Sequence, residues 1–152
     1  MTFPSPFLDT VGVYPDLLGD VRTWLRAHPF LTAVTGRVFF RIPDTAVFPL
    51  IRIYDAGTTK QPGEVPIVNS LVGVDVWGAV KIAGATYADV DTITRAVAAA
   101  FDLLPAGTLI GTGTVILNSE SGTTVDSPDP DTGAPRKVLT AALMARALTA
   151  NG

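Results

Sequence analysis

The spacing of apolar residues changes from a helical to a strand-like period along this chain of 152 residues, and this change constrains its fold more than any other feature. Residues 15–28 carry apolar side chains at helical spacing opposite charged ones, and Pro15 favours a helix start. Residues 29–34 add a short helical turn, which Gly36 closes. From Arg37 the period becomes two, which indicates strands. The chain therefore mixes helices and strands.

Alternation of apolar and polar residues predicts two short strands, at residues 37–42 and 50–54. Segment 56–66 is polar and rich in glycine and proline, so it is predicted to be a long loop. A longer strand is predicted over residues 67–79. Its valines lie on one face, which should meet the core: Val68, Val72, Val74 and Val76.

The second half of the chain repeats the change of period. Thr86 and Asp89 resemble a capping box, and helical spacing then continues to Leu104. Residues 108–119 are rich in β-branched residues and predict a strand with an irregular, glycine-rich start. Segment 122–135 has the turn residues of a loop.

Residues 137–148 fit two structures. Their alanine, leucine, methionine and arginine content favours a helix by propensity. The same residues can also alternate as a strand that is buried on both faces. Local sequence alone leaves both possibilities open.

Composition indicates one folded domain, over residues 15–149, behind an extended proline-containing arm at residues 1–14. Apolar residues make up 47% of the chain, which is ample for a core. Charged residues make up only 16%, against about 25% in a typical soluble domain. We expect part of the surface to be covered by other protein molecules.

Several classes of protein are excluded or disfavoured. A net charge of −3 disfavours a general nucleic-acid coat. The absence of cysteine excludes disulfides, thiol nucleophiles and cysteine zinc sites. No run of about 18 apolar residues predicts a membrane span, and the N-terminus lacks the pattern of a signal peptide. We expect an intracellular protein without membrane contact.

Catalytic and cofactor patterns are weak. His28 is the only histidine and is expected to cap a helix end or to be exposed, since a triad or zinc site needs further partners. Gly107, Gly111 and Gly113 lack the other residues of a phosphate loop, and the aspartates near Gly133 match only part of a calcium loop. We expect no catalytic residue, cofactor or metal, and no enzymatic activity.

Charge is divided along the chain. Between Val21 and Tyr54 the sequence has five arginines and one acid, Asp44. From Thr86 to Asp131 it has seven acids and one base, Arg95. The residues are Arg22, Arg26, Arg37, Arg41 and Arg52, then Asp89, Asp91, Asp102, Glu120, Asp126, Asp129 and Asp131. The division either lets copies of the chain meet head to tail or merely populates exposed faces.

The order of these segments resembles the tail terminator (tail completion) family of long-tailed bacteriophages. The likeness runs from about Tyr14 to Met144. Its recognisable parts are Gly-Arg-Val at 36–38, a Phe-Pro strand start at 48–51 and Asp-Val-Trp at 75–77. These motifs are structural, and none of them is catalytic.

The resemblance implies an α+β fold, with two main helices packed on one face of a mixed, largely antiparallel sheet of about five strands. The last element of the family is a strand, so residues 137–148 are predicted to form a strand. The implied function is a homohexameric ring that caps the tail tube and joins it to the head-completion (connector) proteins. DNA would pass through only as cargo, and the ring would sit at the head-tail junction of a virion assembled in the host cytoplasm.

Contacts are expected from the two polar loops. Lys60, Gln61 and Glu64 are the candidates for partner contact, and Asp126, Asp129 and Asp131 are the candidates to face the channel, where negative charge would repel DNA. Two other functions remain open. One is another neck or head-closure protein of the same particle, and the other is a small-ligand-binding or enzymatic domain.

Overall fold

The computed structural model describes residues 14–78 and 87–148, so the expected arm up to residue 13 and the Thr86 capping position lie outside the described residues. The described chain forms one six-stranded sheet in the order β1-β2-β3-β6-β5-β4. Its strands are β1 (Val38–Phe39), β2 (Leu50–Gln61), β3 (Ile67–Trp77), β4 (Leu109–Ile110), β5 (Thr114–Asp126) and β6 (Arg136–Ala147). Only β1 and β2 pair in parallel, and the other neighbours are antiparallel.

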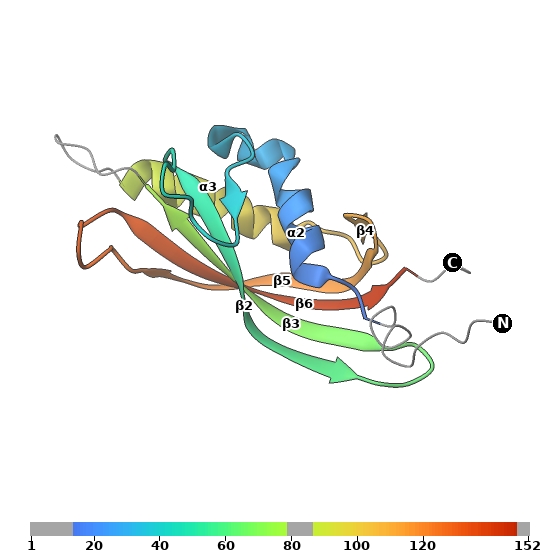
Figure 1. The fold of residues 1–152 in the computed structure, drawn as a ribbon. Coiled ribbons are helices and arrows are strands. Elements are labelled where there is room, and N and C mark those ends of the chain that lie inside the picture. The colour runs from blue at the N-terminus through green and yellow to red at the C-terminus, as the bar shows by residue number, and fades with distance from the viewer. Residues whose placement is uncertain (1–13, 79–86, 149–152) are drawn as a thin grey trace.

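The helices lie together on one side of the curled sheet (Figure 1). They are α2 (Leu17–Arg26), the 3₁₀ segment η1 (Pro29–Val34) and α3 (Tyr87–Asp102). Asp16 caps α2, because its Oδ1 accepts a hydrogen bond from the Gly19 amide at 3.2 Å. The predicted fold class is thus observed, with β4 forming a sixth strand.

The core lies between the helices and the valine face of β3. Val72, Val74 and Val76 are fully buried there with Val21 and Leu25 of α2. The prediction that the valine face meets the core is therefore confirmed. The opposite side of the sheet, which carries Tyr54, Leu71, Trp77 and Met144, is called the outer face below.

β6 confirms the strand predicted for residues 137–148. It lies inside the sheet and is hydrogen-bonded to β3 on one edge and to β5 on the other. Its buried residues alternate toward the helices: Leu139, Ala141, Leu143 and Ala145. Pairing on both edges overrides the helix propensity of the segment.

The extent of both predicted loops was wrong. β2 continues through a bulge at Asp55 and Gly57 to Gln61, so only residues 62–66 join it to β3. β5 likewise continues to Asp126. Pairing with the long neighbouring strands β3 and β6 holds these polar residues extended, in spite of their loop-like composition.

Two strand predictions also need correction. The predicted strand 37–42 is reduced to Val38–Phe39, since only these residues pair with β2. The predicted strand 108–119 is instead two strands, β4 and β5, joined at residues 111–113. Buried Asp20 of α2 holds this turn, because its carboxylate accepts hydrogen bonds from Thr112 N at 3.2 Å and Thr114 Oγ1 at 2.6 Å.

Candidate assembly surfaces

The residues expected to contact partners do not lie in a loop. Lys60 and Gln61 end β2, and only Glu64 lies in the connection to β3. The Lys60 ammonium lies 5.1 Å from the ring centroid of Tyr14, on the helix side of the sheet. All three residues are exposed and remain available for contacts. Sequence reasoning missed their strand conformation, because it depends on pairing with β3.

The three aspartates expected to face a channel have different surroundings. Asp126 lies in β5 and bonds to Lys137 Nζ at 3.0 Å, and the same ammonium contacts Asp91 at 3.1 Å. Asp129 accepts hydrogen bonds from Asp131 N at 3.0 Å and Thr132 Oγ1 at 2.8 Å, and these lower the pKa of its carboxyl. The carboxylates of Asp126 and Asp129 are therefore engaged within the subunit, and Asp131 is exposed at the turn.

Arginines of the first half gather beside β1, and we call this surface the basic margin: Arg22, Arg26, Arg37 and Arg41, with Phe39 and Phe40. The Arg22 guanidinium stacks 4.7 Å from the centroid of Phe40. Arg26 Nε donates to Val38 O at 3.0 Å, and partial burial, with the charge of Arg22, lowers its pKa. Arginine and exposed aromatic rings are enriched in protein interfaces.

Several acids of the second half lie toward the opposite edge of the sheet, and we call this surface the acidic margin: Asp102, Glu120 and Asp126, with Leu103, Leu109 and Val125. Asp102 at the end of α3 accepts hydrogen bonds from Ser121 N at 2.7 Å and Ser121 Oγ at 2.8 Å. Leu103 is 66% exposed and Val125 is 55% exposed. Part of the charge division thus becomes a spatial one across the order of the strands, while Arg52 pairs with Asp75 inside the sheet and Asp91 and Asp126 pair with Lys137.

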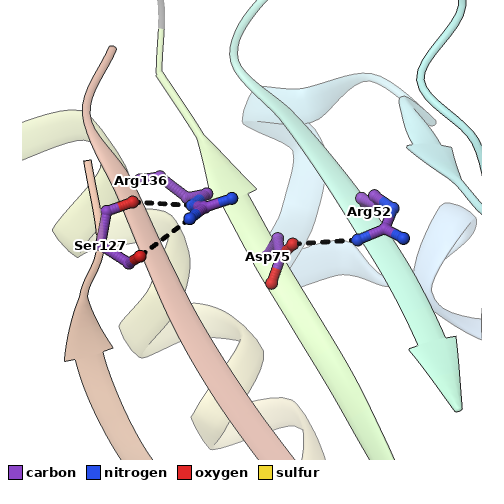
Figure 2. Close-up of polar contacts among 4 residues, drawn as sticks. All are labelled: Arg52, Asp75, Ser127 and Arg136. Atoms are coloured by element: carbon purple, nitrogen blue, oxygen red, sulfur yellow. Dashed lines mark hydrogen bonds and ion pairs between the residues drawn. The ribbon is translucent and has the colours of Figure 1, made fainter. Parts of the chain in front are cut away.

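A polar row crosses the outer face near one end of the sheet. Arg52 Nη1 of β2 lies 3.3 Å from Asp75 Oδ2 of β3, while Arg136 of β6 stacks 4.7 Å from the Trp77 ring centroid. Ser127 holds Arg136, accepting from Nε at 2.7 Å and from Nη2 at 2.8 Å (Figure 2). These contacts fasten three strands together.

Asp75 in this row is 4% exposed, and burial raises the pKa of its carboxyl, against the opposing effect of Arg136 and Arg52. Among the described residues, Asp75 Oδ1 and Trp77 Nε1 are buried without a hydrogen-bond partner. A hollow of about 460 Å³ lies farther along the outer face, between Leu71, Asn118 and Met144.

His28 caps a helical segment, but not in the expected way. Its Nδ1 accepts a hydrogen bond from the Phe30 amide at 3.1 Å, at the start of η1 rather than at the end of α2. Partial burial lowers its pKa, which favours the neutral ring that this bond requires. Within residues 14–78 and 87–148, no group of three or more metal-ligating side chains is present, and no helix has the length and apolar character to cross a membrane.

The chain matches no protein-family model and no curated protein sequence. Its fold is similar to that of a chain in a solved structure titled as the virion of a native gene transfer agent particle. The superposition has a TM-score of 0.67 and covers 86% of this chain and 94% of that chain. With 15% sequence identity, the likeness is one of fold.

Proposed function

We propose that this chain is a structural virion protein, a tail terminator whose identical subunits form a ring that caps the tail tube. The ring would join the tube to the head-completion (connector) proteins and let DNA pass through its centre. The virion role is supported by the fold, which matches nearly the whole of a chain from a virion particle. The finer assignment to a tail terminator rests on the order of the elements and on the three motifs that resemble that family.

The observation that carries the ring is the placement of unlike charges toward opposite edges of one sheet. The basic margin lies at the β1 side, and the acidic margin lies at the β4 and β5 side. A surface that complements a different surface of the same molecule makes a head-to-tail contact, and repetition by a fixed rotation closes a ring. Exposed Phe40 on one margin and Leu103 on the other add apolar area to such a contact.

Light scattering and negative-stain electron microscopy test this proposal. The purified protein is measured well above micromolar concentration, alone and mixed with tail tubes. We expect closed rings in at least one condition, with six-fold class averages for the homohexamer. Assembly should weaken in Arg41→Glu, which reverses an exposed charge on the basic margin. A strict monomer in both conditions would reject the ring.

Another neck or head-closure protein is the second candidate, because the matched chain belongs to a virion without a stated position in it. The tail tube separates the two roles. A tail terminator binds the end of a tube, where electron microscopy with gold-labelled protein can place it. A head-closure protein would bind connector rings instead and leave tube ends unlabelled.

A further inference from the structure

Two long strands have free edges in the part of the chain that the structure describes. β1 pairs with β2 only as far as Arg52, so the outer edge of β2 has no neighbouring strand over residues 53–61. Thr108 and β4 cover β5 only as far as Ile116, so β5 has no outer neighbouring strand over residues 117–126. Free edges are where one sheet can extend into another.

We propose that β2 of one subunit pairs with β5 of the next copy, so that the sheet continues from subunit to subunit. This inference rests on the proposed ring and names the strands that form it. β2, β3, β6 and β5 are successive antiparallel neighbours, so β2 and β5 run in opposite directions. Rotation about a ring axis preserves the direction of each strand relative to that axis, and the junction is therefore antiparallel.

The ladder fixes a register for this junction. Within one subunit, Gln61 pairs with Ile67, Ile67 pairs with Arg146, and Arg146 pairs with Val115. Gln61 and Val115 therefore lie at the same level of the sheet. We shift the neighbour's β5 by two rungs, that is, by two residue pairs, which brings Gln61 opposite Asn118. The two steps lead from Val115 to Ile116 and from Ile116 to Asn118, because Leu117 has no partner in the ladder between β5 and β6.

The same shift matches the other end of the free stretches. Within one subunit, Ile53 pairs with Val74, Val74 with Leu139, and Leu139 with Thr124, so Ile53 and Thr124 lie at the same level. The shift of two rungs brings Ile53 opposite Asp126, the last residue of β5. The free edge of β2 thus spans the unpaired stretch of β5 from end to end, and Ser121 N, which donates to Asp102 Oδ1 in the single subunit, exchanges this bond for one across the junction. β1 of one subunit then lies beyond the end of the neighbour's β5, and the covered start of β5 lies beyond Gln61, so neither short edge strand obstructs the junction.

The irregularities of the two strands also coincide in this register. The bulge of β2 lies between Asp55 and Gly57, directly before Thr58, and the bulge of β5 lies between Ser121 and Thr124. A two-rung shift places Asp55 opposite Thr124 and Thr58 opposite Ser121. Because both extra residues fall between the same two pairs, the strands stay in register on either side.

Side chains that meet across the junction are compatible. On the outer face, Tyr54 comes opposite Val125, which is 55% exposed in the single subunit, and the Tyr54 ring itself lies over Gly73 of its own subunit. On the helix side, Lys60 comes opposite Ser119 and diagonal to Ser121. Ser121 Oγ is bonded to Asp102, so unlike charges approach each other there.

Engineered cysteines test the register directly, because the chain has no cysteine of its own. Thr59 and Glu120 are exposed and come opposite each other on the outer face. Opposed strand residues lie about 4.5–5.5 Å apart between Cα atoms, within the range of a disulfide. A Thr59→Cys, Glu120→Cys double variant, oxidised with and without tail tubes, should give a ladder of covalent oligomers on a denaturing gel. An equimolar mixture of the two single variants should stop at dimers.

The matched control is Thr59→Cys with Thr124→Cys, which lies about 10 Å from the opposed position along the strand and should cross-link at least tenfold less. If electron microscopy shows rings but the double variant cross-links no better than this control, the edge pairing is wrong and the ring stands. If neither rings nor cross-links form, both proposals are rejected. Disulfide dimers of Thr59→Cys alone would mean that like edges meet, which also overturns the junction.

Discussion

The ring of Tyr54 lies on Gly73, its partner across the ladder between β2 and β3. A Cβ atom at position 73 would overlap the Tyr54 ring, which the Arg52 guanidinium holds from 4.9 Å. Gly73→Ala should lower the free energy of unfolding by about 1–3 kcal/mol, because the ring must leave its position. Urea denaturation measures this change. Gly63→Ala is the control, since a Cβ there meets nothing within 4 Å, and equal losses in the two variants would contradict the prediction.

Asp20 should be a strong determinant of stability. Its carboxylate accepts hydrogen bonds from Thr112 N and Thr114 Oγ1, and the Asp20 residue is only 8% exposed. Asp20→Ala should cost about 2–4 kcal/mol in unfolding free energy, because hydrogen bonds to a buried charge are lost and their donors stay buried. Asp44→Ala, at an exposed acid between β1 and β2, should change stability by less than about 0.5 kcal/mol. A loss at Asp20 as small as that at Asp44 would show that the β4–β5 turn is held by other contacts.

Asp75 should make stability depend on pH in a direction opposite to that of a typical surface acid. Burial raises its pKa above the ordinary 3.8, so the folded protein holds its proton more tightly than the unfolded chain does. The contribution of this group to stability therefore falls as pH rises through the window above 3.8. The comparison is wild type against Asp75→Asn, in which Arg52 and Arg136 remain. We expect the wild type to gain stability relative to the variant as pH falls from 7 toward 4, measured by thermal unfolding, and a constant difference would contradict this.

His28→Ala should leave ring assembly intact, because the proposed function uses no catalytic group. The variant loses the acceptor for the Phe30 amide, so a decrease in stability of about 0.5–1 kcal/mol is expected at pH 8. Since the pKa of His28 is lowered from 6.5 in the folded state, the stabilisation is present above 6.5 and is lost as pH falls through the folded value. The difference from wild type should therefore shrink at pH 5. A correctly folded and assembled variant that no longer completes tails would reveal a chemical role for His28.

The periodicity of apolar residues was sufficient to place the main elements. It predicted the α2 stripe that includes Val21 and Leu25, the α3 stripe that includes Val97 and Phe101, and the valine face of β3, all of which are buried in the core. Such patterns are local, because each helix or strand must present one apolar face whatever its neighbours are. The division of charge could also be read from the chain, although not its separation across the sheet.

Tertiary structure decided the elements whose own composition is ambiguous or misleading. Residues 136–147 favour a helix by propensity, and they form a strand because β3 and β5 supply hydrogen bonds on both edges. Lys60 and Gln61 lie in a segment with the composition of a loop, but they belong to a strand because β3 pairs with them. Asp20 stabilises a turn more than 90 positions away. Local sequence determines which side chains are apolar and favour burial. Strands and side chains distant in sequence determine which groups the polar backbone forms hydrogen bonds with.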